Sequence, residues 1–110
     1  MAYEEALAER IRALVAGVDG VTEKRMFGGL AFLVGGNMAI AASGEGGILV
    51  RVDPTESARL VEGTAAEVAV MRGRPMAGWL RVASADLGGE ALAGWAERGI
   101  AFAASLPPKR

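Results

Sequence analysis

The sequence predicts an α+β domain in which helices cover one face of a mainly antiparallel sheet. Apolar residues near the N-terminus recur every three or four positions, whereas those in the middle of the chain alternate with period two. The 110 residues fit one domain, residues 1–110, with a core that needs no disulfide or metal. The expected order is helix, three strands, helix, two strands, helix, arranged as two layers.

The first helix is expected over residues 3–17, where Gly17 and Gly20 would end it. Its apolar face consists of Tyr3, Leu7, Ile11, Leu14 and Val15. We interpret this face as core-facing, and a partner-binding helix is the alternative.

Three strands joined by short turns follow, which predicts an antiparallel meander. The residues expected on one face are Leu30, Phe32 and Val34, then Met38, Ile40 and Ala42, then Ile48, Val50 and Val52. Gly35-Gly36 supplies the first turn and the Gly44–Gly47 stretch the second. A phosphate-cradling loop is the weaker interpretation of that stretch, because such a loop leads from a strand into a helix.

The second half of the chain predicts two more helices and two more strands. Asp53-Pro54 begins a short helix, with Glu56 placed for a capping box, and Gly63 ends it. Strands are expected over residues 67–71 and 78–83, and a final helix follows Asp86. The apolar face of this last helix is Leu92, Trp95, Ala96, Gly99, Phe102, Ala103 and Leu106, and Pro107-Pro108 prevents its continuation.

The composition excludes several kinds of catalytic site. The chain has no histidine and no cysteine, which removes thiolate nucleophiles, imidazole bases and zinc sites of the usual kind. Asp53, Glu56 and Asp86 are better explained as helix caps than as acid–base groups. We therefore expect no enzyme activity, catalytic residue, metal or cofactor; carboxylate chemistry is the weakest alternative.

Charge and hydropathy narrow the choice of partners. The net charge is −1, so strong nucleic-acid binding is not expected, although Arg72, Arg74 and Arg81 gather near the last hairpin and could form a basic patch with Arg51. No apolar run reaches membrane-spanning length, and the first residues lack the basic and apolar regions of a signal peptide. We expect a cytoplasmic protein that does not enter the membrane.

The segment Arg25-Met26-Phe27-Gly28-Gly29 is the most specific motif, because adjacent glycines before an apolar strand indicate a bulge or a close backbone approach. This motif resembles the TfoX N-terminal-domain family, bacterial proteins related to the competence regulator TfoX/Sxy. Residues 49–53, 76–82 and 105–109 match the same family in order.

The resemblance covers nearly the whole chain and implies a small, free-standing member of that family. It implies a fold shared in outline with secretion chaperones. It also implies a regulatory or protein-interaction module with no catalytic residues to carry over. A protein partner, with a homodimer as one form of it, is the function we expect.

The motif Arg25–Gly29 is the first candidate binding site: Arg25, Met26, Phe27, Gly28 and Gly29. The glycines expose backbone amides beside a cation, so an anion or small ligand could bind there and the domain could act as a sensor. The simpler interpretation is that Arg25 is a surface residue paired with a carboxylate.

The second candidate site is an interface on the sheet face opposite the helices. If Leu80 and Val82 face the helices, alternation places Trp79 and Arg81 on the other face, together with Leu49 and Arg51. Tryptophan and arginine are typical of protein interfaces. The alternative is a register shifted by one residue, which would make Trp79 a core residue.

Overall fold

The protein has the expected α+β architecture, seen in a computed structural model that describes residues 3–26 and 28–108. Within these residues there are three helices and a six-stranded antiparallel sheet. The helices are α1 (Glu5–Val15), α2 (Ser57–Gly63) and α3 (Ala91–Ser105). The strands are β1 (Val21–Met26), β2 (Gly29–Val34), β3 (Asn37–Ala42), β4 (Ile48–Arg51), β5 (Glu67–Met71) and β6 (Arg74–Val82).

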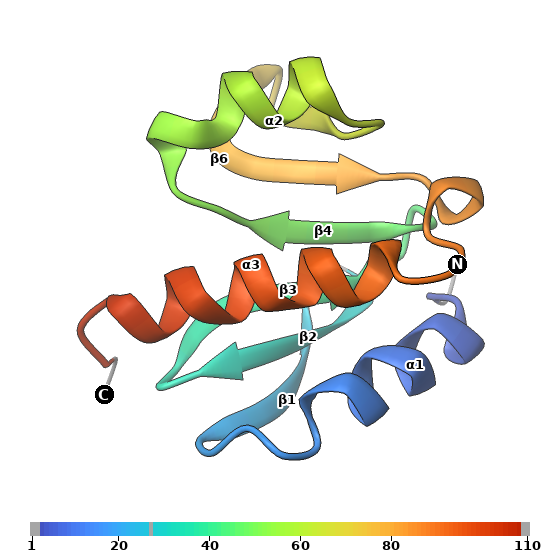
Figure 1. The fold of residues 1–110 in the computed structure, drawn as a ribbon, viewed down its shortest axis with the longest axis vertical. Helices are drawn as coiled ribbons and strands as arrows, with labels where there is room; N and C mark the ends of the chain where they lie inside the picture. The colour runs from blue at the N-terminus through green and yellow to red at the C-terminus, as the bar shows by residue number, and fades with distance from the viewer. Residues whose placement is uncertain (1–2, 27, 109–110) are drawn as a thin grey trace.

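The strands lie in the order β1-β2-β3-β4-β6-β5, and every neighbouring pair is antiparallel. Figure 1 shows α1 and α3 on the same side of this sheet, with α2 beside β6. Apolar residues of all three helices join one face of the sheet in a single core cluster. The two-layer prediction is therefore confirmed.

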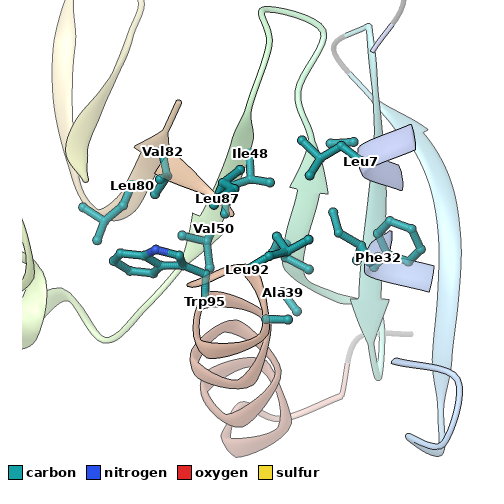
Figure 2. Packing of buried hydrophobic residues seen from close by; sticks show 14 of the residues in the cluster. Leu7, Phe32, Ala39, Ile48, Val50, Leu80, Val82, Leu87, Leu92 and Trp95 are labelled. Atoms are coloured by element: carbon teal, nitrogen blue, oxygen red, sulfur yellow. The ribbon is translucent and has the colours of Figure 1, made fainter. Parts of the chain in front are cut away.

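The core lies between the helices and one face of the sheet. Figure 2 shows Leu92 and Trp95 of α3 packed among side chains of the central strands, with Leu7 of α1 and Phe32 of β2 to one side. Helix α3 approaches β3 very closely at Gly99, where an added Cβ would lie 2.3 Å from the backbone oxygen of Ala39. Only glycine permits this approach, so the small residue sets the distance between the two layers.

One strand, β1, was not predicted from the sequence. Its residues Val21–Met26 are mostly exposed and polar, because β1 forms an edge of the sheet and only its two end residues are partly buried. Charged edge strands of this kind discourage pairing with other chains. The salt bridge from Arg12 of α1 to Glu23, with an Nε–Oε2 distance of 2.6 Å, connects β1 to the helical layer.

The face assignment of Met38 was wrong. The pairing of β2 with β3 shifts between Phe32 and Leu33, so that Phe32 lies opposite Ile40 while Leu33 lies opposite Met38. Ala39 is the extra residue of this β-bulge, and it reverses the alternation. Ile40 therefore faces the helices, whereas Met38 belongs to a second cluster on the other face.

Two carboxylates stabilise the connections between layers and turns. Glu4 accepts hydrogen bonds from the Gly47 amide at 2.9 Å and from the Ser84 hydroxyl at 2.9 Å, which lowers the pKa of Glu4. Asp53 accepts hydrogen bonds from the Thr55 amide and hydroxyl, which lowers the pKa of Asp53 and confirms it as a cap.

The expected capping box at Glu56 does not form. Its carboxylate pairs with Arg59 at 3.0 Å, and the side chain makes no capping hydrogen bond. Asp86 also does not cap the last helix: it ends a short 3-10 turn, Ser84–Asp86, and α3 begins only at Ala91.

The segment 72–77, expected as a loop, is mostly strand. Residues 72 and 73 form the turn with φ of 53° and 77°, as a tight hairpin requires, and β6 begins at Arg74. Between the pairs Val70–Pro75 and Val68–Leu80, β6 carries extra residues that bulge from the ladder. Gly78, with φ of 87°, lies in this bulge, and its amide donates to Ser57 Oγ at 3.3 Å.

Candidate functional site: a groove on the open sheet face

The face of the sheet turned away from the helices, here called the open face, carries its own apolar cluster. Its buried members are Ala31, Leu33, Met38, Ala41, Leu49 and Ala69. Met26, Met71 and Trp79 pack against them and remain partly exposed. Within the described residues, the buried apolar side chains of all three helices belong to the core cluster on the other face of the sheet. The helices therefore do not cover the open face.

A groove of about 900 Å³ lies on the open face. Its floor comes from β2, β3 and β4, and the β5–β6 hairpin tip forms one wall with Val70, Met71, Arg72, Arg74 and Met76. Four of the five methionines of the chain line this groove, namely Met26, Met38, Met71 and Met76; the fifth is residue 1, outside the described residues. Methionine side chains are flexible and polarisable, and surfaces rich in them adapt to varied apolar partners.

The hairpin tip exposes apolar surface to solvent. Val70 is 60% exposed and Met76 is 37% exposed. The third large apolar side chain of this kind in the described residues is Leu14, at 43% on α1. Two of the three exposed large apolar side chains therefore lie on one rim of the groove.

The groove is asymmetric in charge. Arg81 donates to Ser43 Oγ at 3.0 Å and to Glu45 Oε2 at 3.4 Å, so this cation is partly neutralised. Arg72 and Arg74 flank the hairpin turn and make no salt bridge among the described residues. The rim that exposes Val70 and Met76 therefore also carries two cations that pair with no carboxylate of residues 3–26 and 28–108.

The predicted interface residues lie where alternation put them. Leu80 and Val82 belong to the helix-facing core, while Leu49 and Trp79 belong to the open-face cluster. Trp79 is thus half-buried on the open face, which rejects the alternative of a shifted register. Leu49 and Arg81 line the groove, and Trp79 packs beside it.

Arg51 lies beside Trp79, as alternation predicted, but it does not form the expected basic patch with Arg72, Arg74 and Arg81. Its guanidinium lies 5.0 Å from the centroid of the Trp79 ring and 5.5 Å from that of Phe102 on α3. Contact with two aromatic faces stabilises the cation at the end of β4. Arg51 therefore connects the two layers and does not join the arginines of the groove.

The motif Arg25–Gly29 is divided by the sheet. Met26 and Gly29 line the groove, whereas Arg25 pairs with Leu30 of the helix-facing cluster and so lies on the other face. Gly28 has φ of 77° in the turn, and Phe27 lies outside the described residues. The motif and the predicted interface thus meet at the groove through Met26, Gly29, Leu49 and Arg81.

The two glycines of the motif have a packing role. A Cβ on Gly29 would lie 2.4 Å from the Ala42 oxygen, and one on Gly44 would lie 2.7 Å from the Gly28 oxygen. The β1–β2 turn therefore touches the β3–β4 turn backbone to backbone, as the close-approach interpretation requires.

Val70, Met71 and Met76 were not predicted as site residues. The chain did offer a signal: apolar residues surround an Arg-Gly-Arg turn, whereas a solvated turn usually has polar neighbours. Their convergence with Met26 and Met38 at one groove depends on where the hairpin tip lies relative to the sheet, which local sequence does not encode.

The described residues hold no cluster of three or more carboxylates arranged to ligate a metal ion. Across residues 3–26 and 28–108, every helix is too short or too polar to cross a membrane.

Comparison with known proteins identifies one family. The family model described as TfoX N-terminal domain matches residues 13–103. This span contains the whole sheet, α2 and most of α3, and therefore the entire groove. Neither the curated proteins nor the solved structures contain a match to this chain.

Proposed function

The chain belongs to the TfoX N-terminal domain family, and we propose that it is a non-enzymatic protein-interaction module with a regulatory role. Its partner binds on the open face, in the methionine-lined groove. The proposal includes a cytoplasmic location, which stays a prediction.

The observation that carries this proposal is the composition of the groove rim. Val70 and Met76, which are both exposed, line the groove together with Arg72 and Arg74. Methionine and arginine are enriched at protein interfaces, and contiguous exposed apolar surface marks sites of interaction. The rigid sheet beneath the groove supports such a site at little cost in ordering.

Action without catalysis is supported by the residues themselves. The chain has no histidine or cysteine, Asp53 is a cap, and Glu56 pairs with Arg59. An anion sensor at Arg25 is the less favoured proposal, because the adjacent glycines already have a packing role. Absence of thermal stabilisation by phosphate, sulfate or nucleotides would reject that sensor.

Affinity capture with matched variants tests the interaction module. Nuclease-treated extracts of the source organism are passed over the wild type, the double variant Val70→Ser/Met76→Ser, and the control Leu14→Ser. All three side chains are exposed, so the fold should survive in each variant. We expect a partner that the groove variant loses and the control retains. Equal capture by all three proteins would contradict a binding role for the groove.

A further inference from the structure

We propose that the groove recognises an extended segment of a partner protein in which apolar residues alternate with Asp or Glu. This inference rests on the proposed function and names the chemistry of the partner. Three properties of the described residues support it: the apolar floor, the charge of the rim, and the size of the face.

The floor selects apolar side chains. Met38, Leu49 and Ala41 form it, and Met26 and Met71 rise at its sides. Their polar backbone groups are already paired in the sheet, so the surface offered to a ligand is chiefly side-chain carbon and sulfur. Burial of leucine-sized side chains against it is favourable at about 25 cal/mol per Å².

The rim selects negative charge. Arg72 and Arg74 reach the groove without a carboxylate partner among the described residues, and Arg81 is only partly neutralised by Glu45. Four ionic side chains line the groove, three of them arginines. Guanidinium groups bind carboxylates in paired hydrogen bonds, which gives both affinity and orientation.

The same charge argues against a second copy of this chain as the occupant. Two grooves facing each other would bring the arginines of both rims together, and like charges at an interface cost several kcal/mol. The net charge of the chain is −1, so attraction between whole molecules does not offset this repulsion. A partner of opposite local charge avoids it.

The shape of the site favours a peptide over a small acid. Val70 and Met76 at the rim are exposed to solvent. A small acid bound on the floor of the groove would leave them exposed, whereas a longer peptide can cover both the floor and the rim. The molecule is 31 × 30 × 28 Å, so about nine extended residues span its face.

Peptide binding tests the charge preference directly. The probes are three labelled peptides of about nine residues in which leucine alternates with glutamate, glutamine or lysine. Fluorescence anisotropy is measured at about 50 and about 300 mM salt. We expect the glutamate peptide to bind at least about tenfold more tightly than the lysine peptide, with the difference shrinking at the higher salt.

Charge reversal locates the contact. In Arg72→Glu/Arg74→Glu the preference for the glutamate peptide should disappear or invert. The control Arg25→Glu changes an exposed cation on the other face of the sheet and should leave the preference unchanged. Any of three results overturns the inference: the control loses the preference to the same extent, the three peptides bind with equal affinity, or the glutamate peptide does not bind up to about 1 mM.

Two further measurements separate the other occupants. In the first, laurate is tested for thermal stabilisation. If laurate stabilises the wild type but not Arg72→Glu/Arg74→Glu, and none of the peptides binds, the groove is a site for small apolar acids. Self-association in sedimentation that Val70→Ser/Met76→Ser abolishes would assign it to a second copy. Either result overturns the peptide inference.

A crosslinking experiment distinguishes failure of this inference from failure of the proposed function. A photo-crosslinker at residue 76 joins the captured partner, and the attached segment is sequenced by mass spectrometry; residue 14 carries the control crosslinker. If a partner depends on the groove but is crosslinked through a neutral or basic segment, the preference for an acidic segment is wrong, while the proposed function as an interaction module still holds. A crosslinked segment rich in Asp or Glu supports both.

Discussion

The two faces of the sheet use the same strands for different purposes. The face under the helices carries large, fully buried side chains such as Phe32, Ile40 and Ile48, which pack against three helices. The open face carries alanines and methionines around Leu33 and Leu49, and it borders a groove of about 900 Å³. One face therefore stabilises the fold, while the other combines partial packing with space for a ligand.

Because of this difference, truncating a buried side chain should cost more free energy of unfolding on the covered face than on the open face. A cavity made under the helices is closed, so its lining loses contacts that nothing replaces. A cavity made beside the groove fills with water or collapses, so it costs less free energy of unfolding. Substitutions of equal size should then have unequal effects, which gives a direct way to break the comparison.

Ile48 and Leu49 are adjacent in β4 and face opposite sides of the sheet. We expect Ile48→Ala to cost about 3 to 4 kcal/mol of unfolding free energy, and Leu49→Ala about 1 to 2 kcal/mol, because only the first leaves a closed cavity. Urea denaturation at one pH measures both. Equal losses would mean that the open face is as tightly packed as the covered one.

Gly99 tests how closely the covered face is packed. Gly99→Ala places a methyl group 2.3 Å from the Ala39 oxygen, so we expect a loss of about 1 to 3 kcal/mol as α3 moves away from β3. Gly94→Ala is the matched control in the same helix, where the nearest atom is a flexible arginine nitrogen at 3.8 Å. It should gain about 0.5 to 1 kcal/mol from helix propensity, measured by thermal unfolding. A gain in both variants would show that the layers can separate freely.

Glu4 links the start of the covered layer to the β3–β4 turn. Hydrogen bonds from Gly47 and Ser84 lower its pKa below 4.5, so its contribution is present above that value and is lost as the pH falls through the folded-state pKa. The Tm difference between wild type and Glu4→Gln should be positive at neutral pH and shrink in acid. Glu97→Gln, an exposed position in mid-α3, is the control. A difference independent of pH would rule out the charge as its cause.

The smallest effect on stability is expected at the rim of the groove. Val70→Ser and Met76→Ser should each change the free energy of unfolding by no more than about 0.5 kcal/mol, as Leu14→Ser should, because all three side chains are exposed on the surface. Differential scanning fluorimetry of the three variants gives the comparison. A loss of several degrees in Tm at Val70 or Met76 would assign the rim to the fold instead of to binding.

Much of the fold followed from local pattern. Alternation in β4 and β6 correctly placed Leu49, Trp79 and Arg81 opposite the core, because a strand turns successive side chains to opposite faces. The same rule failed at Met38, where a bulge at Ala39 reverses the faces. A bulge depends on how two strands pair, and the strand that contains it gives no separate warning.

The candidate sites were predicted less completely. The motif Arg25–Gly29 was identified, but its glycines mark a contact between two turns and its arginine lies across the sheet from the groove. β1 was missed because an edge strand in solvent needs no apolar alternation.

The sequence by itself determined the helices, the central strands and the face of each buried residue that lies in an unbroken ladder. These features depend on interactions between residues a few positions apart, which periodicity and caps record. Tertiary structure alone decided that Met26, Met38, Met71 and Met76 would line one groove, at whose rim Arg72 and Arg74 make no salt bridge with any residue that the structure describes. These methionines come from four strands, and only the tertiary arrangement of these strands brings them together.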